Sequence, residues 1–93
     1  MSITRINEFK SAVGKEDELL AFLRSLISYI SSSEGCVSCE VLQGNDELDC
    51  FVVVEKWDSI AAHSLSIKNF PKEEMQAAMP LFGAPPIGRF YKS

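Results

Sequence analysis

The clearest hydrophobic pattern in the chain is a stripe of aliphatic residues that recurs at helical spacing after Gly14. Steps of one, three, three, one and three residues place these side chains on one face of a helix: Leu19, Leu20, Leu23, Leu26, Ile27 and Ile30. Acidic residues fill positions 16–18, where the helix dipole favours anions. Gly35 follows the stripe and suits a left-handed cap. The pattern therefore predicts an amphipathic helix that begins near Lys15 and ends before Gly35.

Four other segments have the composition of β-strands and are separated by turn residues. They are Ser2–Lys10, Cys36–Gln43, Leu48–Trp57 and Ile87–Tyr91. The turn residues Gly44-Asn45-Asp46-Glu47 join the second segment to the third and are typical of a hairpin. We therefore expect these two strands to pair as neighbours.

Two shorter helical segments are expected between the third and fourth strands. Asp58 is the predicted N-cap of a helix over Ser59–Lys68, and Pro71 opens a second helical piece. The apolar side of that piece is formed by Met75, Ala78, Met79 and Phe82. The order β-α-β-β-α(α)-β predicts one α+β domain over residues 1–93, with an antiparallel sheet in the ferredoxin-like arrangement.

The third strand is apolar on both faces. Because side chains alternate along a strand, one set points one way: Leu48, Cys50, Val52 and Val54. The other set points the opposite way: Phe51, Val53 and Trp57. In a ferredoxin-like fold the helices cover only one face of the sheet. Leaving the other face wet forgoes about 1.5–3 kcal/mol for each large side chain. We therefore expect a homodimer in which two sheets pack face to face into a barrel-like body, the alternative being a monomer with an exposed apolar sheet.

Composition and charge narrow the possible partners. The chain has 93 residues, of which 46% are hydrophobic, and a formal net charge of −4. That charge argues against non-specific binding of nucleic acid or of acidic lipid, since both need basic surfaces. The run Phe51–Val54 is apolar, and no apolar run in the chain exceeds five residues, whereas a membrane-spanning helix needs about 20. No apolar stretch follows Arg5, so no signal peptide is predicted and a cytoplasmic location is expected.

The three cysteines favour free thiols in a reducing compartment, because their number is odd. Cys36 and Cys39 have the spacing of redox and zinc sites. In a strand, however, positions three apart point to opposite faces, so the two thiols are expected to diverge. A zinc site needs four ligands, and only Cys50 and His63 are left to complete one. The sequence therefore predicts buried or half-buried free thiols and no metal site.

His63 is the single histidine and the natural candidate for a proton acceptor. It falls in an apolar stripe of the second helix with Ile60, Ile67 and Phe70, which predicts that the imidazole faces inward. The alternative is a core histidine that bonds to a backbone carbonyl or to water.

Three other polar or aromatic residues are candidates for ligand contacts. Trp57 ends the third strand with one N–H donor, although packing in the core also explains it. Asn7 is unusual inside a strand and either donates to a ligand oxygen or lies at an exposed edge. Arg89 in the last strand either pairs with an anionic ligand or forms a surface ion pair. No paired-carboxylate, phosphate-loop or serine-nucleophile motif is present.

A long amphipathic helix follows Gly14, Glu34-Gly35-Cys36 leads into Cys39–Gln43, and Glu55-Lys56-Trp57-Asp58-Ser59 is followed by His63. Together these segments, which span nearly the whole chain, resemble the antibiotic biosynthesis monooxygenase domain. The resemblance implies a dimeric α+β barrel with a pocket between the sheet and the helices of each subunit. This agrees with the homodimer expected from the third strand.

Members of this family differ in activity. Some oxygenate aromatic polyketide intermediates or quinols with O2 and without metal or flavin, some isomerise small sugar-derived signals, and some cleave haem. The resemblance therefore implies a monooxygenase that needs no cofactor and acts on a small aromatic, phenolic or quinol-type substrate. Haem cleavage ranks low, because Trp57 precedes the second helix and no histidine follows His63. The alternative from another class is a non-catalytic dimer that binds a hydrophobic small molecule.

The implied oxygenase chemistry assigns roles to the candidate residues. A base must generate an electron-rich substrate anion, and donors must hold the oxyanion in a dry pocket. His63 is the expected base, and Trp57 and Asn7 are the expected donors. The expected substrate-binding residues are Phe70, Met75, Met79, Phe82 and Arg89.

Overall fold

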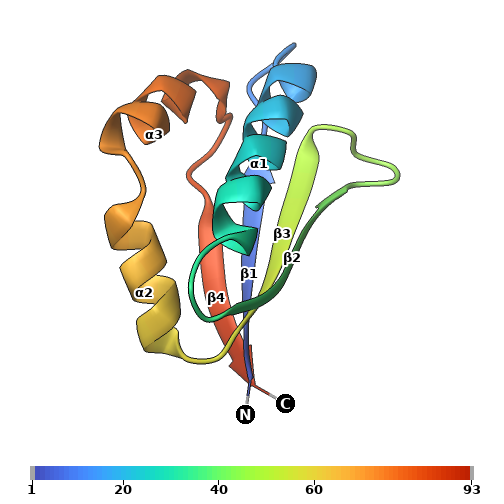
Figure 1. Ribbon diagram of the computed structural model, residues 1–93. Coiled ribbons are helices and arrows are strands. Elements are labelled where there is room, and N and C mark those ends of the chain that lie inside the picture. The colour runs from blue at the N-terminus through green and yellow to red at the C-terminus, as the bar shows by residue number, and fades with distance from the viewer. Residues whose placement is uncertain (1, 93) are drawn as a thin grey trace.

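The computed structural model describes residues 2–92 and contains one four-stranded sheet with helices packed on one of its faces (Figure 1). The elements are β1 (Ile3–Lys10), α1 (Glu16–Ser31), β2 (Cys36–Gln43), β3 (Cys50–Trp57), α2 (Ile60–Asn69), α3 (Lys72–Ala78), the 3₁₀ turn η1 (Met79–Leu81) and β4 (Ile87–Lys92). This order confirms the predicted α+β, ferredoxin-like fold. No helix within residues 2–92 is long and apolar enough to cross a membrane.

The strands β1 and β3 form the centre of the sheet, and β2 and β4 form its edges. The spatial order is β2-β3-β1-β4, and every neighbouring pair is antiparallel. The helix α1 carries the chain from β1 to β2, and α2 and α3 carry it from β3 to β4 (Figure 1). Each crossover therefore leaves a central strand and returns to an edge strand.

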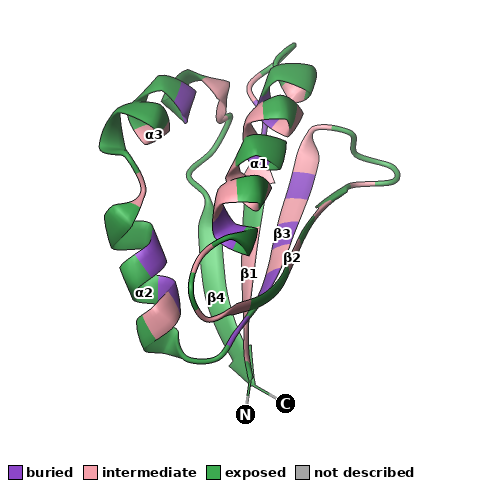
Figure 2. Cartoon of the chain, viewed as in Figure 1, coloured by how far each residue is buried: buried purple, intermediate pink, exposed green. Residues whose placement is uncertain are grey.

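The core lies between the inward face of β3 and the apolar stripe of α1. Phe51 and Val53 of β3 pack against Leu19 and Leu23 of α1, and none of the four is more than 1% exposed. Burial of side chains of this size stabilises the fold by about 1.5–3 kcal/mol each. The buried positions on β3 alternate with half-buried ones, as Figure 2 shows. The strand therefore presents one face to the helices, as its period of two predicts.

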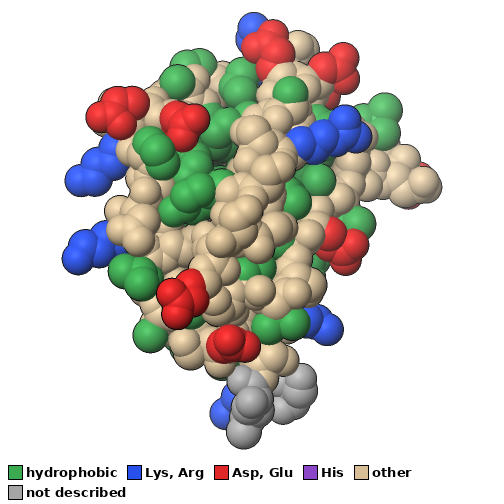
Figure 3. Space-filling model, viewed as in Figure 1, with side chains coloured by type: hydrophobic (Ala, Val, Ile, Leu, Met, Phe, Trp, Pro, Cys, Tyr) green, Lys and Arg blue, Asp and Glu red, His purple; other side chains and the backbone are tan. Residues whose placement is uncertain are grey.

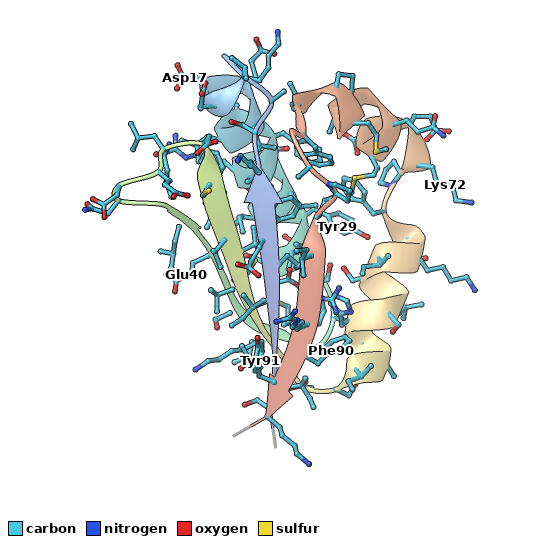
Figure 4. All side chains as sticks on the ribbon, turned by 180° about the vertical axis from the view of Figure 1, so that it is seen from behind. Asp17, Tyr29, Glu40, Lys72, Phe90 and Tyr91 are labelled. Carbon is cyan, nitrogen blue, oxygen red and sulfur yellow. The ribbon has the colours of Figure 1, made fainter. Side chains whose placement is uncertain are left out.

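The opposite face of the sheet, called the open face below, has no helix over it (Figure 4). The strand register places Ile6, Val52 and Val54 at its centre. Around them Leu42, Ile87 and Tyr91 are about half exposed, at 50%, 51% and 48%. The strand β3 is therefore apolar on both faces, as predicted, and this chain alone leaves one of those faces in contact with water.

Two predicted boundaries differ from the structure. Leu48 lies before β3 and is exposed, because hydrogen bonds from Gly44 N to Cys50 O and from Cys50 N to Glu47 O close the turn there. The N-cap of α2 is Ser59, not Asp58, since the Ser59 hydroxyl accepts from Ala62 N at 3.1 Å.

The prediction that the thiols of Cys36 and Cys39 diverge is wrong. A β-bulge between Cys36 and Ser38 inserts one extra residue into β2. As a result Cys36 pairs with Trp57 and Cys39 pairs with Glu55, and both partners belong to the inward face of β3. The two cysteines therefore share the face of the sheet that the helices cover. Within residues 2–92 all three cysteines are free thiols.

Gly35 allows the turn between α1 and β2 to pack against α2. Its φ of 87° is in the left-handed region, as expected for the cap. A Cβ atom at this position would lie 2.5 Å from the Cβ atom of Ala62, so no larger residue fits. The carbonyl of Gly35 also accepts from Asp58 N at 2.8 Å. The turn therefore fixes the point at which the chain enters α2.

Gly35→Ala is expected to lower the free energy of unfolding more than the matched control Gly14→Ala. Both glycines have positive φ, at 87° and 75°, and the backbone alone makes each substitution cost about 1–2 kcal/mol. A Cβ atom at Gly14 meets nothing within 4 Å, whereas one at Gly35 meets Ala62. Urea denaturation measures both losses, and equal losses would contradict the close packing of this turn on α2.

Candidate functional site

The imidazole of His63 lies between two aromatic rings on the helix-covered face of the sheet. It is 5% exposed, so the prediction that it faces inward is confirmed. The ring centroids of Trp57 and Phe90 lie 5.5 and 5.0 Å from that of His63, and both meet it edge to face. Within residues 2–92, the His63 side chain has no hydrogen bond of its own. Its nitrogen atoms therefore remain available to a ligand.

The stripe that predicted this orientation is placed differently in the structure. Ile60 and Ile67 are 47% and 59% exposed, whereas the buried residues of α2 are His63 and Ser66. The inward side of α2 carries small residues because Ala62 lies so near Gly35 that a Cβ atom added to the glycine would be 2.5 Å from the Cβ atom of Ala62. Close approach of the helix to that turn, rather than a run of large apolar residues, therefore directs His63 toward the sheet.

A buried carboxylate, Glu55 of β3, connects the predicted site residues. It is 3% exposed and receives two short hydrogen bonds. Trp57 Nε1 donates to its Oε1 at 2.8 Å, and Asn7 Nδ2 donates to its Oε2 at 2.7 Å. Position 55 falls on the same face of the strand as positions 51, 53 and 57, and that alternation was the signal by which sequence reasoning could have found it.

His63 and Glu55 lie close enough together to interact electrostatically. The distance from His63 Nε2 to Glu55 Oε1 is 4.0 Å, which is too long for a hydrogen bond but within range of an ion pair. Because both side chains are buried, little solvent screens this interaction. A proton taken up by His63 would therefore be stabilised by Glu55.

Arg5 extends the cluster toward the β4 edge of the sheet. Its Nε donates to Asn7 Oδ1 at 3.0 Å, while Asn7 in turn donates to Glu55. The guanidinium carbon lies 4.6 Å from the centroid of the Phe90 ring, in the geometry of a cation–π contact. A positive charge therefore stands beside the carboxylate and the imidazole without forming a direct ion pair with either.

Burial shifts the protonation of Glu55 and His63 toward their neutral forms. It raises the pKa of Glu55 above its ordinary value of 4.5, an effect that the Trp57 hydrogen bond, the charge of Arg5 and the Asn7 hydrogen bond partly offset. Burial lowers the pKa of His63 below its ordinary value of 6.5, and Arg5 lowers it further. His63 is therefore neutral at neutral pH and able to accept a proton.

The two cysteines of β2 border this cluster as protonated thiols. Burial, Glu55, Cys36 and Glu40 raise the pKa of Cys39 to about 12. Burial and Glu55 also raise the pKa of Cys36. A thiol is a weak nucleophile and metal ligand until it loses its proton. Burial, together with the negative charge of the site, therefore suppresses the reactivity of both residues.

The expected substrate-binding residues lie apart from His63. Phe70 packs on Tyr29 at 5.1 Å, and Phe82 contacts the rings of Phe9 and Phe22 beside the core. Met79 is 59% exposed and Met75 is half-buried on α3. Arg89 pairs with Ile6 and is exposed on the open face. The structure thus brings His63, Trp57 and Asn7 together and distributes the other five elsewhere.

Two hollows lie between the helices. One of about 360 Å³ lies between α1 and α3 and is lined by Phe22, Ser25, Tyr29, Phe70, Glu74, Ala77, Ala78 and Leu81. Figure 3 shows hydrophobic side chains in the region between these helices and no surface of His63 on this side of the molecule. The other, of about 600 Å³, lies between the end of α1 and α2, and serines line much of it. His63 lines neither hollow.

A cluster of possible metal ligands occurs at the far end of β3. The side chains of Glu47, Asp49 and Cys50 place donor atoms within 4.8 Å of one another in the turn between β2 and β3. Within residues 2–92 it is the one such group, and His63 does not belong to it. Since β3 runs from Cys50 to Trp57, this turn and the His63 cluster lie at opposite ends of the strand.

The sequence pattern of the family described as antibiotic biosynthesis monooxygenase matches residues 2–79. No curated protein matches the chain at a significant level. A solved structure of a protein from Shewanella oneidensis is 27% identical to the chain, with a TM-score of 0.86 over 97% of this chain and 88% of that one.

Two further solved structures share the fold at lower identity. A candidate antibiotic biosynthesis monooxygenase from Nitrosomonas europaea is 14% identical, with a TM-score of 0.91 over 99% of this chain and 89% of that one. SnoaB from Streptomyces nogalater, a cofactor-independent oxygenase, is 15% identical, with a TM-score of 0.85 over 99% of this chain and 92% of that one. At these identities the likeness establishes the fold.

Folding stability is expected to fall as the pH is lowered through the window just below 6.5. In that window the unfolded chain protonates its histidine, whereas folded His63, with its lowered pKa, does not. Denaturant titrations across this window should show the slope in the wild type and its loss in His63→Phe, while Glu55→Gln should steepen it, because the raised pKa of Glu55 contributes with the opposite sign. Because His63 is the single histidine, its imidazole NMR signals give the pKa directly, and a midpoint above 6.5 would contradict the assignment.

Proposed function

The chain belongs to the antibiotic biosynthesis monooxygenase family, and we propose that it is a cofactor-independent monooxygenase of small aromatic, phenolic or quinol-type substrates. The family match and the cofactor-independent oxygenase among its structural neighbours support a general monooxygenase-like role. The observation that carries the finer proposal is the buried imidazole of His63, which has Glu55 at 4.0 Å and no other polar partner within residues 2–92.

Oxygenation without a cofactor requires the substrate itself to supply electrons. Ground-state O2 accepts electrons one at a time, so a neutral phenol or acidic C–H compound must first lose a proton to become a good reductant. In the overall reaction an activated CH2 group and O2 give a carbonyl group and water, so both oxygen atoms are accounted for. The protein must therefore provide a base and an environment with little water.

His63 meets both requirements. Its lowered pKa keeps the imidazole neutral at neutral pH, and its burial keeps bulk water away. Since Nε2 is the nitrogen nearer to Glu55, Nδ1 is the one left to accept the substrate proton. The imidazolium that forms is then stabilised by the carboxylate of Glu55. His63 is the catalytic base of this proposal.

Trp57 and Asn7 act through Glu55 instead of holding the substrate oxyanion directly. Each already donates an N–H group to one oxygen of the carboxylate. They fix the orientation of Glu55 relative to His63 and offset part of the cost of burying its charge. In this role the two are positioning residues, which differs from the donor role expected from the sequence.

The proposal includes a homodimer formed through the open face. Its central residues Ile6, Val52 and Val54 and its half-exposed residues Leu42, Ile87 and Tyr91 make up an apolar surface on one side of the sheet. A second copy of the same face would cover these side chains, and each is worth about 1.5–3 kcal/mol when fully buried. The site of His63 lies on the other face, so dimerisation through the open face would not cover it.

A non-catalytic binding protein is the second candidate. The hollow of about 360 Å³ between α1 and α3 is lined mainly by apolar residues, and His63 does not line it. A hydrophobic ligand held there would have no base beside it. This candidate predicts binding of small aromatic compounds without oxygen consumption at any pH.

His63→Ala is expected to lower kcat/KM about 10²–10⁴-fold, the usual contribution of a positioned general base. Oxygen uptake with an anthrone and a naphthoquinol measures the rate, and Lys68→Ala on the exposed side of α2 is the control. In the wild type the rate should rise with pH through the lowered pKa of His63 and be level above 6.5. Unchanged turnover in His63→Ala would remove the base from the mechanism, and binding without turnover in the wild type would favour the second candidate.

Sedimentation at micromolar concentration is expected to show a dimer that the double substitution of Leu42→Lys and Ile87→Lys dissociates. Both residues are half exposed in one subunit, so two new charges on the open face should disturb association more than folding. Ile67→Lys, at an exposed position of α2 away from the open face, is the matched control. A wild-type chain that sediments as a 10.3 kDa monomer would disprove the proposed assembly.

A further inference from the structure

The ring of Phe90 fills the space between the cation of Arg5 and the imidazole of His63. Phe90 pairs with Arg5 across β4 and β1, so its side chain lies on the helix-covered face near α2 (Figure 4). Its ring centroid is 5.0 Å from that of His63 and 4.6 Å from the guanidinium carbon of Arg5. An aromatic ring that belongs to the protein therefore already has a positive charge over its face and lies perpendicular to the candidate base, in contact with it.

Among the side chains that pack on His63, Phe90 is the one that is able to leave. It is 37% exposed and belongs to an edge strand whose residues are all exposed (Figure 2). Trp57, the other ring in contact with His63, is 1% exposed and is held by its hydrogen bond to Glu55. His63 is 5% exposed and lines neither of the two hollows, so an aromatic ligand that packs on the imidazole needs the space of a neighbouring side chain. Since Phe90 is the more exposed of the two rings and has no hydrogen bond to break, its rotation toward solvent would make that room.

Arg5 has N–H groups that are free to donate hydrogen bonds to a ligand. Of its guanidinium nitrogens only Nε donates to a side chain within residues 2–92, and no carboxylate there lies close enough for an ion pair. Gly88 on β4 makes this placement possible, since a Cβ atom there would collide with the guanidinium group and lie 2.5 Å from Asn7 Oδ1. The N–H groups of Trp57 and Asn7 are already bound to Glu55. Arg5 is therefore the strong donor of this cluster that is still available.

We propose that, in the empty site, the ring of Phe90 occupies the position at which the aromatic ring of the substrate binds, and that Arg5 binds the anionic oxygen of that substrate. The site then selects planar aromatic compounds that carry one negative oxygen group in addition to the acidic C–H or O–H group whose proton His63 accepts, over neutral compounds of the same shape. This inference rests on the proposed function in one respect: it takes the ligand to be the substrate of the monooxygenase. Arg5 and Phe90 are the specificity-determining residues of this site. Arg5 acts through its charge, and Phe90 acts by closing the site when it is empty.

Binding of two matched probes tests the inference without any turnover. Calorimetry compares 2-naphthoate with 2-naphthylmethanol, a neutral compound of similar shape, under nitrogen and at a pH where the acid is ionised. Wild-type protein is expected to bind the anion about tenfold more tightly, since a bond to a charged group is worth about that factor. The NMR signals of the single imidazole should shift on binding and thereby place the ligand beside His63.

Substitutions separate the two roles. Arg5→Met is expected to abolish the preference for the anion, whereas the control Arg24→Met, on the exposed side of α1, retains it. Phe90→Ala should bind both probes about tenfold more tightly, because no ring has to be displaced before binding. Tyr91→Ala, the neighbouring aromatic residue on the open face, is its control. Phe90→Leu serves the same purpose if the alanine variant does not fold.

The inference is overturned if Arg5→Met keeps the preference, if neither Phe90 variant binds more tightly than the wild type, or if binding leaves the His63 signals unmoved. These outcomes are independent of the oxygen-uptake assay. Anion-selective binding beside His63 without oxygen consumption would support this inference and refute the monooxygenase. Oxygen consumption that depends on His63 but shows no anion selectivity would support the monooxygenase and overturn this inference.

Discussion

Everything in the site depends on the burial of one carboxylate. Glu55 stands in the middle of the inward face of β3 at 3% exposure, and a charge in that position is costly unless donors satisfy it. Trp57 and Asn7 provide those donors at 2.8 and 2.7 Å, and Arg5 orients Asn7. Satisfying the carboxylate therefore fixes three side chains on two neighbouring strands. Because these strands form the centre of the sheet, the geometry is held by the most rigid part of the fold.

Periodicity was sufficient to predict the fold, since the aliphatic stripe of α1 and the alternation in β3 each have one structural interpretation. It also predicted that His63 faces inward, while residue type alone singled out Trp57 and Asn7, which the structure places around the same carboxylate. Glu55 was missed because a single charge within an apolar strand is usually taken as an outward-facing position. The alternation with Phe51, Val53 and Trp57 places it on the inward face, and the burial pattern of β3 confirms this.

The remaining differences come from contacts that no local pattern encodes. A bulge of one residue turns Cys36 onto the face of Cys39, because each added residue reverses the alternation of the strand. The inward side of α2 is set by the close approach of Ala62 to Gly35, which lies far away in the sequence. The positions of Arg5, Gly88 and Phe90 depend on the pairing of the first strand with the last. Long-range pairing of this kind is visible only once the sheet is assembled.

The exposed ring of Phe90 also explains how a base can remain neutral in an empty site. With the ring in place, water has little access to His63, and the desolvation that lowers the pKa of the imidazole is present before any ligand arrives. A substrate ring that replaces Phe90 would exclude water in the same way, so the imidazole would stay neutral from the empty to the loaded state. In the empty state the charge on Arg5 lowers the pKa of His63 further, since a nearby cation disfavours the imidazolium. Once a substrate anion neutralises that cation, the repulsion weakens and proton transfer to His63 becomes more favourable, which couples recognition of the anion to the basicity of the site.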